Sequence, residues 1–239
     1  MNVQLFIPCF VDQIYPGTGF NMVKVLEKCG CVVDYNPDQT CCGQPAFNAG
    51  YWDEAKAVGH KFLKDFHGYD YIVSPSASCT GFVRNYYGKL FDNSASHNEM
   101  KLVQKNLFEF TEFLTKVLHV TDVGATLEGV ATYHDSCAGL RECKIKSEPR
   151  TLLDHVQGLE IREMTDVETC CGFGGTFAVK YEPISSGMAD QKINNALATG
   201  ADYIISTDLS CLMHLAGYIE KRGLNLKTMH IADVLASGW

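Results

Sequence analysis

The sequence lacks any uncharged apolar run near the ~20 residues that a membrane helix requires. It also lacks a run rich in lysine or arginine, and its formal charge of -8 offers little attraction to nucleic-acid phosphates or anionic lipid. A secretory signal is not expected, because the first residues carry no basic segment and Asp12 interrupts a short apolar stretch. We therefore expect a cytoplasmic protein with no nucleic-acid partner and no membrane insertion.

The spacing of the cysteines shows another absence. The chain has 11 cysteines, yet none are arranged as Cys-x-x-Cys, the usual knuckle of a structural zinc site. Disulfides are disfavoured in a reducing cytoplasm, so metal binding or catalysis is the expected use of so many thiols. Burial as small apolar residues is the alternative for a few of them. It does not account for two Cys-Cys-Gly triplets.

These triplets belong to an internal repeat. The segment VVDYNPDQTCCGQ corresponds to LEIREMTDVETCCGFGG, and YDYIVSPSASCTGF corresponds to ADYIISTDLSCLMH. Upstream of each pair, an apolar run ends at Cys9 in one copy and at Cys137 in the other, with nearly equal intervals between cysteines in the two copies. The pattern predicts a first repeat over residues 1–122 and a second over 123–239.

Within each repeat, short β-branched runs alternate with helical patterns. Such alternation predicts an α/β fold of two tandem pseudo-symmetric repeats, each a small, mainly parallel sheet flanked by helices. The predicted strands are Val3 to Ile7, Cys31 to Tyr35, Tyr71 to Val73, Val130 to Tyr133, Leu159 to Arg162 and Tyr203 to Ile205. The predicted helices are Gly19 to Lys28, Trp52 to Phe66, Glu148 to His155, Ile184 to Ala198 and Leu212 to Lys221.

The end of the first repeat also has a helical pattern. Apolar residues recur at helical spacing between Leu102 and Val117, and TDVGATLEG follows as a linker. The sequence therefore predicts that the boundary between the repeats lies just after a helix.

The fold prediction brings the cysteines together. Cys9, Cys79, Cys137 and Cys211 follow strand ends, where open parallel sheets gather their ligand sites. Four thiols per repeat suit zinc or an iron-sulfur cluster, and adjacent cysteines favour the cluster because they can bind different irons. Glycines beside the pairs would let backbone pass close to a bulky core, although a plain turn is the alternative; they are Gly43, Gly172, Gly174 and Gly175.

The duplicated pattern of Cys, Cys-Cys-Gly and Cys resembles the cysteine-rich or CCG family of iron-sulfur proteins. That family includes a subunit of heterodisulfide reductase and the iron-sulfur subunit of glycolate oxidase, and TCCGQPAFNAGYWDEA and TCCGFGGTFAVK are most similar to its lactate-utilisation members. The resemblance implies an iron-sulfur subunit of an oxidoreductase complex that oxidises L-lactate, a small 2-hydroxy acid, to pyruvate. The implied partners are companion lactate-utilisation subunits, including a larger iron-sulfur protein.

The resemblance also implies the ligands of one or two [4Fe-4S] clusters, with zinc as a substitute after aerobic purification. These are Cys9, Cys41, Cys42 and Cys79 in the first repeat, and Cys137, Cys170, Cys171 and Cys211 in the second. Heterodisulfide reductases end each motif in Cys-x-x-Cys, whereas this chain has Phe82 or His214 at the last position. This difference weakens the alternative of a disulfide reductase. A zinc-stabilised interaction module is the other alternative.

Polar residues near the second thiol set are candidates for catalysis. Arg141 is suited to hold a substrate carboxylate, and His134 or His214 to relay a proton or bind iron. Structural roles are the alternative for all three. Cys29 and Cys31 border a predicted strand and are expected to be buried and inert, whereas Cys143 is expected near the cluster.

Overall fold

The computed structural model describes residues 1–239 and contains two four-stranded sheets. The strands run in the order β2-β1-β3-β4 in one sheet and β6-β5-β7-β8 in the other, and every pairing is parallel. The prediction of an α/β fold with two mainly parallel repeats is therefore confirmed. The predicted division at residues 122 and 123 falls between the last element of the first sheet's half and β5.

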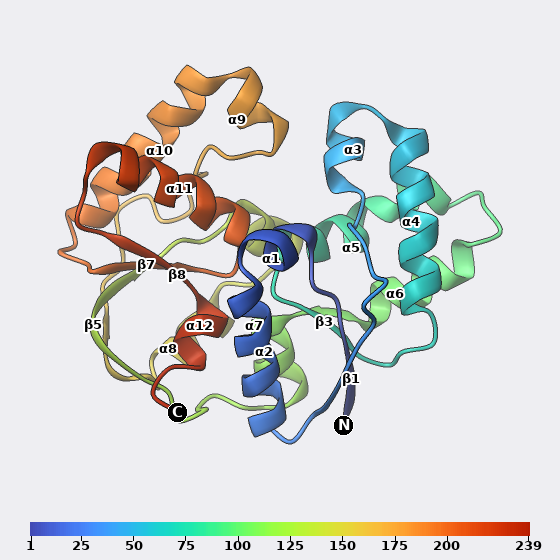
Figure 1. Ribbon diagram of the computed structural model, residues 1–239, viewed down its shortest axis with the longest axis horizontal. Coiled ribbons are helices and arrows are strands. Elements are labelled where there is room, and N and C mark those ends of the chain that lie inside the picture. Colours follow the sequence, from blue (N-terminus) through green and yellow to red (C-terminus); the bar gives the residue numbers. More distant parts are fainter.

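The elements follow one another in the same general order in both halves (Figure 1). The first half contains β1 (Asn2–Leu5), α1 (Cys9–Ile14), α2 (Pro16–Lys28), β2 (Val32–Tyr35), α3 (Gln44–Ala49), α4 (Trp52–Phe66), β3 (Ile72–Ser74), α5 (Ala77–Phe91), α6 (His97–Asn106), β4 (Leu107–Glu109), α7 (Phe110–Glu112) and the π-helix η1 (Phe113–Val117). The second half contains β5 (Thr126–Tyr133), the π-helix η2 (Ala138–Glu142), α8 (Ser147–Leu153), β6 (Gln157–Ile161), α9 (Thr176–Lys180), α10 (Glu182–Leu197), β7 (Tyr203–Ser206), α11 (Leu209–Arg222), β8 (Lys227–His230) and α12 (Ile231–Leu235).

The segment before the linker is not the uninterrupted helix that its apolar spacing predicts. Strand β4 separates α6 from α7, and its residues pair with β3 from Leu107 opposite Ile72 to Glu109 opposite Ser74. The boundary does follow a helix, η1, as predicted, but β4 interrupts the helical spacing because the open edge of β3 offers backbone hydrogen bonds to any adjacent extended segment, and a run as short as Leu-Phe-Glu fits either period.

The two halves share a hydrophobic core and touch through several elements. The larger core cluster takes residues from both sheets, including Leu5 and Ile205. Helix α12 returns to pack against α2, where the Asp233 carboxylate accepts hydrogen bonds from Thr18 and Asn21, both at 2.9 Å. Both chain termini lie at the end of the molecule opposite α3 and α9 (Figure 1). No helix is at once long enough and apolar enough to cross a bilayer.

Candidate metal centre

The first thiol set, Cys9, Cys41, Cys42 and Cys79, is assembled from three parts of the first half. Cys9 is the first residue of α1 after β1, the Cys-Cys pair lies in the loop between β2 and α3, and Cys79 is in the first turn of α5. The Cys9 and Cys41 sulfurs are 3.9 Å apart, and no cysteine of the chain forms a disulfide. The backbone N–H of Gly43 points at the Cys41 sulfur at 3.4 Å.

The second thiol set, Cys137, Cys170, Cys171 and Cys211, repeats this arrangement. Cys137 precedes η2, the Cys-Cys pair follows β6, and Cys211 is in the first turn of α11. The N–H of Gly172 points at the Cys170 sulfur at 3.4 Å, and the N–H of Phe173 points at the Cys171 sulfur at 3.5 Å. Amides directed at sulfur in this way stabilise thiolates and tune the potential of a bound cluster.

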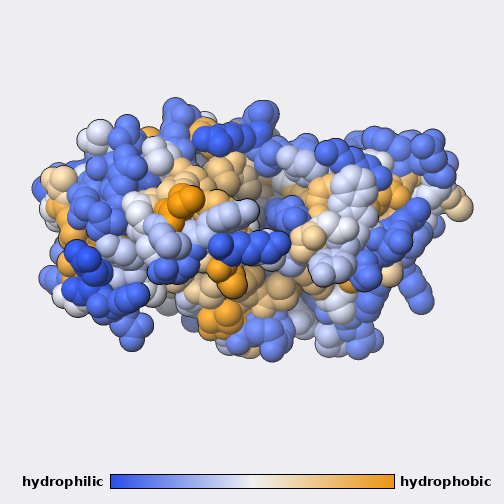
Figure 2. All heavy atoms as spheres, turned by 90° about the horizontal axis from the view of Figure 1, so that it is seen from above, coloured by the Kyte–Doolittle hydropathy of each residue, from blue (hydrophilic) through white to orange (hydrophobic).

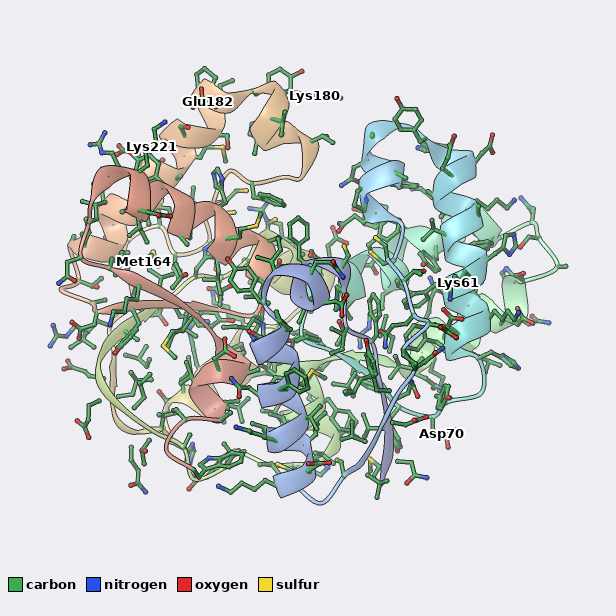
Figure 3. The ribbon with its side chains drawn as sticks, viewed as in Figure 1. Lys61, Asp70, Met164, Lys180, Glu182 and Lys221 are labelled. Atoms are coloured by element: carbon green, nitrogen blue, oxygen red, sulfur yellow. The ribbon has the colours of Figure 1, made fainter.

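Both thiol sets line one cavity of about 260 Å³ between the halves, which we call the central cleft. Its walls include all eight cysteines of the two sets. Phe10 and Phe173 meet edge to face across the halves with their ring centroids 5.7 Å apart. Lys180 and Glu182, at the end of α9 and the start of α10, lie at the outer edge of the second half (Figure 3). Seen from above, apolar residues gather in the middle of this face between hydrophilic flanks (Figure 2).

One thiol in each set is strongly acidified by its neighbours. A hydrogen bond from Cys42, followed by one from Cys9, lowers the pKa of Cys41 to about 3. In the second set, hydrogen bonds from Cys137 and then Cys171 lower the pKa of Cys170 to about 2. The donors in turn have raised pKa values because their protons are held in these bonds and they are partly or wholly buried. The hydrogen bonds within each set therefore favour the thiolate form of Cys41 and of Cys170, and a bound metal would displace the remaining thiol protons.

The glycines beside the cysteines adopt a backbone conformation that other residues rarely adopt. Gly43 has φ of 92° and Gly172 has φ of 94°. A Cβ added at Gly43 would lie 3.1 Å from the carbonyl oxygen of Ala55, and one at Gly172 would lie 2.6 Å from that of Ser185. Gly174 and Gly175 line the central cleft. The lack of a side chain at Gly43 and Gly172 therefore lets the two Cys-Cys loops pack directly against the backbones of α4 and α10.

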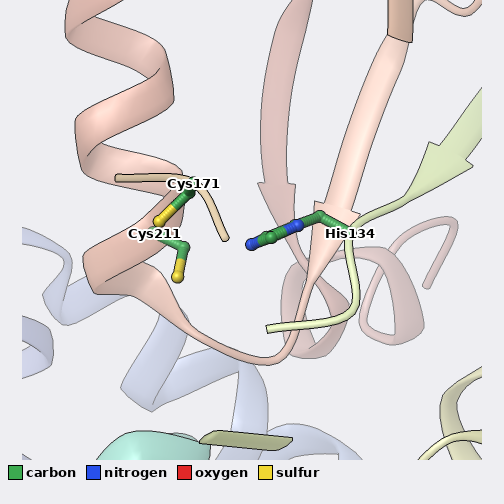
Figure 4. Close-up of side chains that lie close together, drawn as sticks. All are labelled: His134, Cys171 and Cys211. Atoms are coloured by element: carbon green, nitrogen blue, oxygen red, sulfur yellow. The ribbon is translucent and has the colours of Figure 1, made fainter. Parts of the chain in front are cut away.

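The three polar residues near the second set have different surroundings. His134 is fully buried, neither ring nitrogen has a hydrogen-bond partner, and a ring nitrogen lies with the Cys171 and Cys211 sulfurs in a group spanning at most 4.8 Å. Figure 4 shows its ring directed at these two sulfurs. Burial lowers the pKa of His134 to about 3, so the imidazole is neutral.

His214 and Arg141 are not part of this group of His134, Cys171 and Cys211. The His214 Nε2 is 3.1 Å from the Ser185 hydroxyl, which donates to the Gly172 carbonyl at 2.8 Å. Arg141 lines a separate pocket, of about 310 Å³, that shares Cys137 with the central cleft. His214 thus supports the loop of the second set, while Arg141 lines the pocket beside the cleft.

The cysteines outside the two sets do not line the cleft. Cys31 is buried in the larger core, and Cys29 packs against that core. The Cys143 thiol donates to the Ala77 carbonyl at 3.3 Å and packs with Ala77 and Ile145 where α5 meets η2. Cys143 therefore helps to join the two halves.

Sequence reasoning missed the buried Lys192. Its side chain is 1% exposed and donates to the carbonyls of Asp166 and Val167, at 2.7 and 3.1 Å, just before the second Cys-Cys pair. Desolvation lowers the pKa of Lys192, opposed by the nearby Cys171 and Asp166. An alignment of the two repeats extended along α4 and α10 would have placed Lys192 at the position of the buried Phe62.

Comparison with known proteins identifies relatives over the whole chain. A family model described as the cysteine-rich domain, CCG, matches residues 3–84 and 131–216. Lactate utilization protein A 1 of Bacillus cereus (strain AH820) is 44% identical over 237 residues, covering 99% of both chains. Lactate utilization protein A of Bacillus thuringiensis (strain Al Hakam) is similar to the same extent.

A solved structure supports the fold. The crystal structure of a hypothetical protein from Helicobacter pylori matches 100% of this chain with a TM-score of 0.57 at 12% identity. This chain spans only 49% of that protein, so the match concerns the fold alone.

Proposed function

Because the chain belongs to the cysteine-rich, or CCG, domain family, we propose that it is an iron-sulfur subunit of a cytoplasmic complex that oxidises L-lactate to pyruvate. The observation that carries the proposal is the convergence of two four-thiol sets on one cleft. The names of the relatives supply the link to lactate.

The residues around the cleft fit iron-sulfur clusters. Each set offers four thiols, one of them with its pKa lowered by hydrogen bonds from its neighbours, together with backbone N–H groups directed at sulfur. The unpartnered nitrogens of His134 point to a group that fills the space beside the second set. When bound, such clusters supply one-electron transfer. The protein contributes the ligands, the N–H donors and a partly apolar wall that limits access of water.

The electron count of the proposed reaction agrees with two sites. Oxidation of L-lactate to pyruvate releases two electrons and two protons, and two one-electron centres, one held by each thiol set, would together accept the two electrons. Companion subunits, including a larger iron-sulfur protein, would take these electrons onward. We assign the bond-breaking step at the lactate carbon to the assembled complex, with Arg141 as a carboxylate-binding residue in the pocket beside the cleft and His214 as a support for the second Cys-Cys loop.

The first test is the iron and acid-labile sulfide content of anaerobically purified chain. We expect about four or eight irons per chain and a visible spectrum that is diminished by Cys171→Ser. Cys31→Ser is the matched control, because Cys31 is buried in the core away from the cleft, and it should retain the iron. Stoichiometric zinc without iron would instead indicate a structural clasp and refute the redox proposal.

The second test concerns the substrate. L-lactate, added anaerobically to the chain with its companion subunits, should bleach the cluster absorbance, whereas D-lactate serves as the control. A mixture that responds to a disulfide and not to L-lactate would favour the disulfide reductase alternative.

A further inference from the structure

The repeats can be compared position by position because their backbones make equivalent hydrogen bonds. The N–H of Phe6, just after β1, donates to the carbonyl of Val73 in β3 at 2.9 Å. The N–H of His134, just after β5, donates to the carbonyl of Ile205 in β7 at 2.8 Å. Phe6 and His134 therefore occupy the same place, three residues before the first cysteine of each set.

A second pair of positions is fixed by the glycines of the Cys-Cys loops. Gly43 faces the carbonyl of Ala55 in α4, and Gly172 faces that of Ser185 in α10. Seven residues further along the two helices stand Phe62 and Lys192, both buried. Since Phe6 and Phe62 pack edge to face with centroids 4.8 Å apart, an aromatic pair in the first half corresponds to a histidine and a lysine in the second.

A buried histidine in the place of Phe6 lowers the stability of the fold unless its ring nitrogens find a hydrogen-bond partner or a metal. Both nitrogens of His134 are buried without a partner, and a buried polar group without a hydrogen bond is unfavourable. Its ring is directed at Cys171 and Cys211, and a ring nitrogen lies within 4.8 Å of both sulfurs (Figure 4). The missing partner of His134 therefore belongs in the space between these thiols.

We propose that His134 contacts the iron-sulfur centre of the second thiol set through an imidazole nitrogen, a contact that Phe6 cannot make in the first set. The inference rests on the proposed function, since it requires centres in the cleft. The two sites are then chemically different. A nitrogen donor or ligand at a cluster raises its reduction potential, so removal of His134 should lower it.

The charged neighbours of the second set oppose one another. Lys192 brings a cation to the loop before Cys170, whereas Asp208, in the second half, accepts the N–H of Ser78 at 2.8 Å and brings a carboxylate to the same cleft. The test therefore removes His134 alone, because the loss of its imidazole is expected to change the reduction potential in one direction only, downward.

The direct test is pulsed electron paramagnetic resonance of the reduced full chain labelled with ¹⁵N-histidine. We expect a ¹⁵N coupling in the wild type that disappears in His134→Phe, which introduces the residue of the first half. His214→Phe is the matched control and should keep the coupling, because His214 is bonded to Ser185. Fully iron-loaded wild type without any histidine coupling would overturn the inference, and this measurement needs no substitution.

The reduction potential supplies an independent readout. His134→Phe should lower the equilibrium constant for one-electron reduction of one centre at least tenfold, about 59 mV, and leave the other unchanged. Phe6→Leu should shift neither by this amount. Equal shifts of both centres, or no shift, would overturn the inference while iron content still supports the proposed function. Absence of iron would refute the proposed function itself.

Discussion

Replacement of Gly172 by alanine should destabilise the second Cys-Cys loop more than the matching change destabilises the first. Its φ of 94° costs an L-residue about 1–2 kcal/mol. The new Cβ would also lie 2.6 Å from the Ser185 carbonyl oxygen and 3.0 Å from the Met188 Cβ, and overpacking of this kind costs about 1–3 kcal/mol. We therefore expect Gly172→Ala to lower the free energy of unfolding by about 3 kcal/mol.

The matched control is Gly43→Ala in the first half. Gly43 has nearly the same φ, but its added Cβ would lie 3.1 Å from the nearest atom, so we expect a loss of about 1–2 kcal/mol. The assay is urea unfolding of metal-free, reduced protein, because bound metal would add its own stabilisation. Equal losses for the two variants, or a smaller loss for Gly172→Ala, would refute the steric argument.

Three further predictions concern buried polar groups. Burial raises the pKa of Glu109 from 4.5 to about 7, so the protonated side chain stabilises the fold fully below pH 4.5, and this contribution, about 3 kcal/mol in all, is lost as the pH rises through 7. In urea titrations at several pH values, Glu109→Gln should make the free energy of unfolding less dependent on pH. An unchanged pH profile would contradict this prediction. Tyr87→Phe removes a 2.7 Å hydrogen bond to the Cys42 carbonyl and should cost about 1 kcal/mol in the same assay; a neutral variant would show that the bond adds nothing. Asp208→Ala removes the side chain that caps α11 and accepts the N–H of Ser78, so the free energy of unfolding should fall by roughly 1–2 kcal/mol and the melting temperature by several degrees; no change would argue against this contact between the halves.

Much of the fold could be predicted from short-range pattern. Helix α4 has the predicted bounds, and β7 was predicted to within one residue, because an apolar stripe or a β-branched run marks each element. Strands β4 and β8 were not predicted. β4 lies within a segment whose apolar residues recur at helical spacing. β8 has the sequence Lys-Thr-Met-His, which has no strand pattern of its own and is extended because it pairs with β7.

The site could be predicted only in part. Strand ends show where each cysteine emerges, so the grouping of thiols within a repeat follows from the sequence. The docking of the two halves does not, because it depends on contacts such as that of Asp233 with Thr18 and Asn21, far apart in the chain. Lys192 was missed because lysines are almost always exposed, and nothing local distinguishes it from a surface residue.

The tandem arrangement of the repeats determines what the cleft can become. Two copies of a single repeat, related by a twofold axis, would also enclose a cleft, but symmetry would give its two walls identical residues. A mutation on one wall would always appear on the other. In one covalent chain the walls diverge independently: after the Cys-Cys-Gly triplets, Gln44 and Pro45 line one wall, whereas Phe173 and Gly174 line the other. The two walls of the cleft are therefore chemically different within a single chain. A symmetric homodimer of one repeat cannot acquire this difference.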